Sequence, residues 1–370
     1  MMQRVVLTTG GTGGHIFPAL AVAEELKLKH PDVDILFIGG NRGPEREIVQ
    51  DAGIAFKALP AKGVLGKGIA SALSLFWMTQ SAFASYRTLR AFKPDVVAGF
   101  GGYAGFVPVW VARVMGIPTA IHEQNSFPGV TNRILGKRVN RVMLSFQDEH
   151  GFFDPRRTVV TGNPIRRSIL QLRDQMERSS RPRQGRLLVL GGSQGASAIN
   201  KAVTQSLPSF RSLGIKIWHQ SGQADFEEVQ NAYAREQACL ERVDPFITNM
   251  AEAYAWADLV VCRAGASTIS ELTAVGMPSI LIPFPYATHD HQLNNAKHLE
   301  AAGAALVLVQ SYLEEVNLAR AVGDLFSLPG KLQEMAKAAR SQGKPQAAAN
   351  IVNELERLAA IHQGKQKKGL

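Results

Sequence analysis

Short apolar runs alternate with longer amphipathic segments along the whole chain. The apolar runs are continuous and rich in β-branched residues, which is typical of parallel strands that are buried on both faces. We therefore predict strands at residues 5–9, 35–39, 96–99, 119–123, 139–144, 187–190, 215–220, 259–262, 279–283 and 305–310. Helices are predicted between them, for example at 17–30, 198–206, 267–275 and 292–302. This alternation predicts an α/β fold with parallel sheets.

One local pattern occurs twice in the chain. An apolar run enters the loop at 10–14 (GGTGG), and a second apolar run enters the loop at 191–195 (GGSQG). Each loop lies between a predicted strand and a predicted helix, where free backbone amides and the helix dipole favour an anion. Two such loops predict two doubly wound halves that face one anionic ligand across a cleft.

The 370-residue chain is long enough for two domains with cores of their own. Residues 162–164 (GNP) interrupt the strand–helix pattern, and a polar, arginine-rich stretch follows at 173–183. We expect an N-terminal domain at 1–163, a C-terminal domain at 164–345, and a final helix with a basic tail at 346–370. The final helix is compatible with packing on either half.

The net charge of +10 predicts acidic partners such as phosphates, anionic lipid or nucleic acid. The basic residues concentrate between 133 and 186 and at the end of the chain. No aromatic residues are interleaved with them in the manner of a nucleic-acid-binding motif, so nucleic acid is the least favoured partner.

The sequence has few features that indicate the cellular compartment of the protein. Two cysteines are too few for a disulfide framework, which favours a reducing compartment. The first residues lack the charged, apolar and cleavage-site regions of a signal peptide, so none is expected. The longest apolar runs, 69–78 and 301–309, are about half as long as a transmembrane helix. We expect a soluble or peripherally bound protein.

The glycine loops do not match the common nucleotide fingerprints. Ile16 occupies the third glycine position of G-x-G-x-x-G, and the second predicted strand ends in Gly39 and Gly40 without an acidic residue. A nicotinamide enzyme is therefore disfavoured. The sequence also lacks G-x-x-x-x-G-K-[ST], which excludes a P-loop nucleotidase.

A serine hydrolase is an alternative. The second loop fits G-x-S-x-G with Ser193 as nucleophile, and Asp258 and either His289 or His291 follow in the order of an α/β-hydrolase triad. The twin loop at 10–14 counts against this interpretation, because a hydrolase does not need a second anion-binding loop.

Metal ligands are sparse. Asp32 and Asp34 precede a predicted strand, whereas metal-binding carboxylates would follow one, and 289–291 (HDH) lacks a third ligand at useful spacing. No metal and no cofactor are expected.

Three segments carry candidate binding and catalytic groups. Small residues at 265–270 follow a predicted strand and begin a predicted helix. Glu271 lies one turn further on, where its carboxylate could bind a ribose. The alternative is that Glu271 belongs to a helix-capping box with Thr268 or Ser270 nearby. A polar cluster at 122–125 (HEQN) ends another strand. His15 directly follows the first glycine loop, which is a suitable position for a general base above a bound diphosphate. The alternative is that His15 begins a helix and forms a hydrogen bond with the backbone.

Seven short motifs occur in order along nearly the whole chain. They are 10–15 (GGTGGH), 101–103 (GGY), 122–125 (HEQN), 162–166 (GNPIR), 191–195 (GGSQG), 218–222 (WHQSG) and 263–266 (RAGA). Together they resemble the MurG family of bacterial peptidoglycan N-acetylglucosaminyltransferases. The resemblance implies a GT-B fold, with two Rossmann-like, doubly wound domains and the active site in the cleft between them.

The resemblance also implies a reaction and a location. GlcNAc moves from UDP-GlcNAc to the 4-hydroxyl of MurNAc in lipid I, undecaprenyl-diphospho-MurNAc-pentapeptide, and gives lipid II with inversion during peptidoglycan synthesis. The family needs no bound metal. The enzyme would be peripheral, on the cytoplasmic face of the bacterial plasma membrane. Another GT-B transferase that acts on a lipid, and a noncatalytic UDP-sugar-binding protein, remain alternatives.

The resemblance assigns roles to individual residues. His15 is the general base by position, and Glu123 is a second candidate. UDP lies over the second domain, and the first glycine loop faces the diphosphate of the acceptor. Donor contacts are expected at Thr12, Gly13, Gly14, Asn125, Arg166, Ser193, Ile247, Ala266, Ser267, Thr268, Ile269, Ser270, Glu271 and Gln292.

A predicted helix at 69–77 is a candidate membrane patch. Its apolar side comprises Ile69, Leu73, Phe76 and Trp77, and Lys62 and Lys67 precede it. By itself this pattern favours a helix that faces the core. Because the implied acceptor stays in the bilayer, the resemblance favours contact with anionic lipid instead.

Overall fold

The computed structural model describes residues 2–11, 13–41, 45–60, 71–178, 184–192, 195–236, 240–287, 290–313 and 317–367, of which 71–76, 176–178 and 365–367 are described by their backbone alone. The chain forms two compact units. Unit 1 comprises Met1–Arg166 and Pro345–Leu370, and unit 2 comprises Arg167–Lys344. The boundary predicted from the sequence lies after residue 163, and the final segment, which the sequence leaves compatible with either half, belongs to unit 1.

Unit 1 is built on a seven-stranded parallel sheet with the order β3-β2-β1-β4-β5-β6-β7. The strands are β1 (Arg4–Thr8), β2 (Asp34–Gly40), β3 (Ala55–Leu59), β4 (Val96–Gly99), β5 (Thr119–Glu123), β6 (Arg141–Leu144) and β7 (Thr158–Val160). The helices are α1 (Gly13–Lys29), α2 (Glu45–Asp51), α3 (Ser71–Phe92), α4 (Tyr103–Val114), α5 (Val130–Gly136) and α15 (Ala347–Lys367). The doubly wound α/β topology predicted from the sequence is confirmed.

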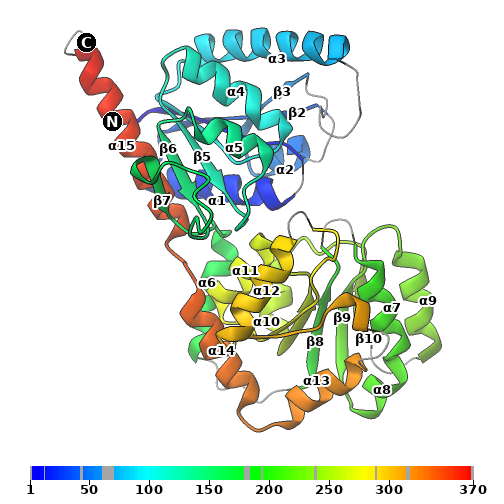
Figure 1. Ribbon diagram of the computed structural model, residues 1–370. Helices are drawn as coiled ribbons and strands as arrows, with labels where there is room; N and C mark the ends of the chain where they lie inside the picture. The colour runs from blue at the N-terminus through cyan, green and yellow to red at the C-terminus, as the bar shows by residue number, and fades with distance from the viewer. Residues whose placement is uncertain are drawn as a thin grey trace. The chain divides into compact units, whose positions relative to one another are not determined.

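Alternation along β1 shows how the helices cover both faces of this sheet. Val5 and Leu7 pack in a cluster with α1, α2 and α15. Val6 points to the other face, where Val109 of α4 and Leu135 of α5 complete a second cluster. Figure 1 shows α3, α4 and α5 on one side of the sheet. Both faces of β1 are buried, which explains its continuous apolar sequence.

Unit 2 repeats the topology with a six-stranded parallel sheet in the order β10-β9-β8-β11-β12-β13. The strands are β8 (Arg186–Leu190), β9 (Lys216–Gln220), β10 (Leu240–Asp244), β11 (Leu259–Cys262), β12 (Ser279–Leu281) and β13 (Ala305–Val307). The helices are α6 (Arg167–Arg178), α7 (Ser197–Gln205), α8 (Leu207–Ser212), α9 (Phe226–Glu236), α10 (Met250–Trp256), α11 (Ala266–Val275), α12 (His291–Ala301), α13 (Leu318–Ser327) and α14 (Lys331–Gln342).

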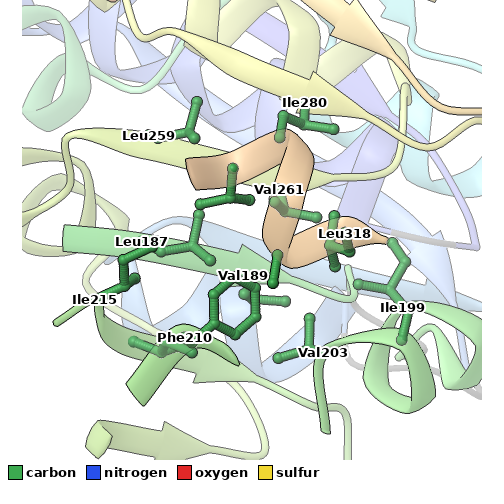
Figure 2. Close-up of a cluster of buried hydrophobic side chains, with 14 of the residues drawn as sticks. Leu187, Val189, Ile199, Val203, Phe210, Ile215, Leu259, Val261, Ile280 and Leu318 are labelled. Carbon is green, nitrogen blue, oxygen red and sulfur yellow. The ribbon is translucent and has the colours of Figure 1, made fainter. Parts of the chain in front are cut away.

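The core of unit 2 lies between the central strands and helices on one face of the sheet. Leu187 and Val189 of β8 and Val261 of β11 point toward Ile199 and Leu318, which come from α7 and α13 (Figure 2). These side chains are buried, so the two central strands pack against α7 and α13.

In each unit, one aspartate links the N-terminal ends of the two central strands by hydrogen bonds. Asp95, just before β4, accepts hydrogen bonds on Oδ2 from the backbone N–H groups of Gln3 (2.7 Å) and Arg4 (2.9 Å). Asp258, just before β11, accepts from those of Gln184 (2.9 Å) and Arg186 (3.2 Å). The internal repeat therefore includes the N-terminal ends of the strands as well as the glycine loops at their C-terminal ends.

The structure differs from the sequence prediction mainly at the sheet edges. The strands β3, β7 and β10 lie at edges and were not predicted. Each is partly exposed, so its sequence lacks a continuous apolar run. The predicted strands at 279–283 and 305–310 end earlier, at Leu281 and Val307. Helix α1 begins at Gly13, earlier than predicted, because the glycine loop itself forms its first turn.

The last helix, α15, is fixed to unit 1 by apolar and ionic contacts. Ile351 and Leu355 join the cluster beneath α1. Glu354 accepts a hydrogen bond from Arg141 of β6 (2.6 Å), and Glu356 pairs with Lys29 of α1 (2.7 Å). Among the described residues, none of the helices is long and apolar enough to cross a bilayer.

Replacement of Asp258 by alanine should lower the free energy of unfolding by about 1.5–3 kcal/mol, because two backbone amides lose a charged acceptor. Asp258→Asn, which keeps an acceptor oxygen, should lose less. Urea unfolding followed by circular dichroism measures both variants. Equal losses for the two variants would show that the hydrogen bonds to Asp258 Oδ2 do not stabilise the sheet.

Candidate active site

The C-terminal ends of β1 and β4 bring two glycine-containing loops of unit 1 into contact. Gly102 has a φ of 74°, and a Cβ atom built on it would lie 1.8 Å from the carbonyl oxygen of Gly10. Only glycine permits this approach. The loop after β4 is thereby held against the loop that leads into α1, at the point where the strand order changes direction.

His15 lies in the first turn of α1, beside these loops. Its ring is half-buried, and its Nδ1 atom lies 2.9 Å from Oε1 of Gln124, which follows β5. Gly101, with a φ of 88°, leaves room for the ring, since a Cβ there would come within 3.2 Å of Cε1 and Nδ1 of His15. The imidazole is therefore held at the strand-end edge, where ligands of doubly wound folds bind.

Glu123 is a buried scaffold residue in this structure. Its carboxylate accepts four hydrogen bonds: from the backbone and side-chain amides of Asn125 (2.9 and 3.2 Å), from the backbone of Gly129 (3.1 Å) and from Asn132 Nδ2 (2.9 Å). Only 2% of the residue is exposed. This geometry favours a role in holding the loop after β5 over the role of general base that the sequence left open for Glu123.

Glu45 occupies part of the first glycine loop. Its Oε1 accepts a hydrogen bond from the backbone N–H of Gly11 (2.9 Å), and the residue is 1% exposed. The amide of Gly11 is thus already used, in contrast to the expectation that the whole loop presents bare amides. Gly13 and Gly14 remain at the N-terminal end of α1, where the helix dipole is positive.

Arg166 is placed beside the same helix by a cation–π contact. Its guanidinium carbon lies 4.5 Å from the ring centroid of Phe17 in α1. Because Phe17 lies one turn after Gly13, a positive charge is kept close to the start of α1. Of the expected donor contacts in unit 1, Gly13, Gly14, Asn125 and Arg166 are described, and Thr12 lies outside the described residues.

The second candidate site lies at the C-terminal ends of β8 and β11 in unit 2. Helix α11 follows β11 and has Gly265 as its N-cap, without a side-chain hydrogen bond to the helix start. The alternative of a capping box at Thr268 or Ser270 is therefore wrong. Ser270 instead donates its hydroxyl to the carbonyl of Ala266 (2.8 Å). The start of α11 thus offers backbone amides to an anion.

Glu271 is oriented by a buried tyrosine. Its Oε2 accepts a hydrogen bond from the hydroxyl of Tyr254 in α10 at 3.0 Å, and Tyr254 is fully buried. The carboxylate itself is half-buried. Tyr254 was not singled out from the sequence, because nothing local relates it to a residue 17 positions away.

The other expected donor-binding residues of unit 2 differ in their exposure and in their hydrogen bonds. Ala266 and Ile269 have buried side chains, whereas Ser267 and Thr268 are half-exposed. Ile247 is buried before α10. Gln292 accepts a hydrogen bond on Oε1 from the backbone N–H of Phe284 (3.0 Å), so it is tied to the loop after β12. Ser193 lies outside the described residues.

The serine-hydrolase alternative is excluded by the position of Asp258. The loop that contains Ser193 follows the C-terminal end of β8. Asp258 precedes β11, which pairs with β8 in parallel, Leu259 opposite Leu187 and Cys262 opposite Leu190. At about 3.3 Å per residue the two ends of these strands are more than 10 Å apart, too far for a catalytic triad.

Within the described part of the chain, no cluster of three His, Cys, Asp or Glu residues could hold a metal ion.

The expected membrane helix is longer than predicted. Helix α3 runs over Ser71–Phe92 rather than 69–77. Lys62, Lys67 and Ile69 lie outside the described residues, the side chains of Leu73 and Phe76 are not described, and Trp77 is half-exposed.

A larger exposed surface, the α3–α5 face, was not predicted from the sequence. Its apolar members are Met78, Phe83, Trp110, Val114, Val130 and Ile134. Its basic members are Arg87, Arg90, Arg113, Arg133, Lys137 and Arg138. Some basic groups lie over the aromatic rings, as Arg138 does over Trp110 at 5.8 Å. The sequences of α4 and α5 could have indicated this face, because a helix that covers a sheet normally exposes polar residues and these two expose apolar ones.

Two doubly wound units with glycine loops at their strand-end edges form the architecture of two-domain GT-B glycosyltransferases. The chain belongs to glycosyltransferase family 28. The N-terminal domain of this family matches residues 5–144, and its C-terminal domain matches residues 186–351.

Several full-length relatives carry the name UDP-N-acetylglucosamine--N-acetylmuramyl-(pentapeptide) pyrophosphoryl-undecaprenol N-acetylglucosamine transferase. The protein from Solidesulfovibrio magneticus is 51% identical over an alignment of 374 residues, which covers 98% of this chain and 100% of the relative. The one from Nitratidesulfovibrio vulgaris is 48% identical over 357 residues, with 96% and 98% covered. The crystal structure of MurG from Acinetobacter baumannii is 34% identical, with a TM-score of 0.72, and covers 96% of this chain and 99% of that one.

Replacement of Glu123 by alanine should destabilise the protein by at least about 1.5–3 kcal/mol, because buried amides lose a charged acceptor. Thermal or urea unfolding measures the loss. A Glu123→Ala variant as stable as the parent but without activity would instead indicate that the carboxylate takes part in the reaction.

Proposed function

We propose that this protein transfers GlcNAc from UDP-GlcNAc to the 4-hydroxyl of MurNAc in lipid I and thereby forms lipid II, a step of peptidoglycan synthesis. The observation that carries the proposal is the identity of 48–51% to transferases of this name, over at least 96% of each chain. The two glycine loops and the groups around them are compatible with a diphosphate donor and a diphosphate acceptor.

The donor binds at the strand-end edge of unit 2 in this proposal. The diphosphate of UDP meets the amides at the start of α11 and the loop that contains Ser193. The ribose hydroxyls bind Glu271, whose carboxylate is oriented by Tyr254, and uracil lies near Ile247. Gln292, which is tied to the loop after β12, contacts the sugar end of the donor.

The chemical step uses His15 of unit 1 in this proposal. Nε2 of His15 takes the proton of the 4-hydroxyl while its oxygen forms a bond to C1 of GlcNAc. The bond from C1 to the β-phosphate oxygen breaks on the opposite side, and its electron pair leaves with UDP, so the configuration inverts. Fixed amides and Arg166 stabilise the charge that develops on the leaving diphosphate. Thr12, Gly13, Gly14 and Asn125 contribute further donor contacts in this proposal.

The α3–α5 face contacts the membrane in this proposal, and the protein is peripheral on the cytoplasmic leaflet. Exposed Trp110, Val114 and Ile134 lie among basic groups, a combination that suits the interface of an anionic bilayer. A polyprenyl acceptor stays in that bilayer, so docking would bring unit 1 to its substrate.

A transfer assay tests the proposed function. The protein is incubated with labelled UDP-GlcNAc and a lipid I analogue, with and without EDTA, and labelled lipid product is expected in both cases. Preference for a different UDP-sugar would indicate another lipid glycosyltransferase. Donor binding without product would indicate a noncatalytic UDP-sugar-binding protein.

The His15→Ala variant should lose about 10²–10⁴-fold in kcat, with little change in donor affinity, as expected when a general base is removed. Steady-state kinetics and calorimetric titration with UDP-GlcNAc measure the two quantities. A change confined to KM would assign His15 to binding instead.

The double variant Val114→Glu/Ile134→Glu should no longer float with anionic vesicles. The two side chains are 76% and 46% exposed, so the fold should be retained. Anionic lipid should contribute about 1 kcal/mol per nearby basic residue, screened by salt. The control is Leu28→Glu on α1, where the side chain is 51% exposed and the helix covers the opposite face of the sheet. Equal flotation of the double variant and the control would place membrane contact elsewhere.

A further inference from the structure

The side chains of His15, Gln124 and His122 form a continuous hydrogen-bonded chain in unit 1. Nδ1 of His15 lies 2.9 Å from Oε1 of Gln124. Nε2 of Gln124 lies 3.2 Å from the carbonyl oxygen of Phe100 and 3.1 Å from Nδ1 of His122. Nε2 of His122 lies 3.0 Å from the carbonyl oxygen of Gly162. The chain therefore ends on backbone carbonyls, which only accept hydrogen bonds.

The carbonyl of Phe100 determines which way the amide of Gln124 faces. An acceptor cannot face an acceptor, so the NH₂ group of Gln124 must point to Phe100, and its oxygen must point to His15. Gln124 is buried, so water does not compete for these groups. Because Oε1 of Gln124 only accepts, Nδ1 of His15 must carry the proton.

The carbonyl of Gly162 determines the state of His122 in the same way. Nε2–H of His122 donates to that carbonyl, which leaves Nδ1 of His122 to accept the second N–H of Gln124. Burial lowers the pKa of His122 to about 4, so this ring is neutral near neutral pH. His122 and Phe100 thus hold Gln124 in one orientation.

We propose that Gln124 is a positioning residue that keeps His15 in the tautomer protonated on Nδ1, which leaves the lone pair of Nε2 ready to accept a proton. The inference rests on the proposed role of His15 as general base. An imidazole protonated on Nε2 has no lone pair there and cannot accept the proton of the 4-hydroxyl. Free imidazole side chains in water prefer that Nε2–H form, so the protein must impose the other one.

The tautomer is observed directly by NMR on the unmodified protein, independently of activity. Two-bond ¹H–¹⁵N correlation spectra of protein with ¹⁵N-labelled histidine distinguish the two neutral forms. The His15 signals are assigned by their absence in His15→Ala. We expect a protonated Nδ1 on the neutral ring of His15 and a protonated Nε2 on the neutral ring of His122. A protonated Nε2 on His15 would overturn the inference and leave the transfer reaction itself untouched.

Two variants of nearly equal size separate the hydrogen bond from packing. Gln124→Met removes the acceptor, so His15 should shift to the Nε2–H form, and kcat should fall by up to about 10²–10⁴-fold with an unchanged KM for the donor. Gln124→Glu keeps an oxygen that accepts from Nδ1–H, so it should retain the His15 tautomer. Its second oxygen must carry a proton to bond the carbonyl of Phe100, so kcat should lie between that of the unmodified protein and that of Gln124→Met.

The outcomes also separate this inference from the proposed function. Loss of kcat in Gln124→Met with an unchanged His15 tautomer would overturn the positioning role. A His15→Ala variant with full kcat would refute His15 as base, whatever the spectra show for Gln124. Should Gln124→Met fail to fold, the spectra of the unmodified protein and of Gln124→Glu still decide the tautomer.

Discussion

The parallel pairing of β1 with β4 and of β8 with β11 is the constraint on which both candidate sites depend. Parallel strands place their C-terminal ends at one edge, so the loops that follow them gather there. Asp95 and Asp258 hold the other ends of the same strands by accepting backbone hydrogen bonds. The strands are thereby fixed at one end, and binding groups are collected at the other.

The two units place different chemistry at this shared position. Unit 1 has a histidine in the first turn of α1, backed by buried polar groups and a nearby arginine. Unit 2 has the start of α11 and a carboxylate oriented by a buried tyrosine. The first arrangement suits proton transfer, and the second suits a nucleoside diphosphate. The same topology is therefore compatible with two different tasks, according to the side chains that follow each strand.

Local signals in the sequence were sufficient for the central strands and for the position of His15 near the start of a helix. These features lie in contiguous runs, and both faces of the central strands are buried. The edge strands β3, β7 and β10 could not be predicted, because partial exposure removes the apolar pattern. The bond between His15 and Gln124 joins residues 109 positions apart, and only the folded sheet brings them together. The α3–α5 face is similarly distributed over three helices, so no single segment indicates it.

Hydrogen–deuterium exchange with and without UDP tests the division of tasks most directly. If unit 2 binds the nucleotide, UDP slows amide exchange most at residues 265–271, at the start of α11, and less at residues 13–16 of α1. Slower exchange at 13–16 with no change at 265–271 would place the nucleotide on unit 1 and contradict the account.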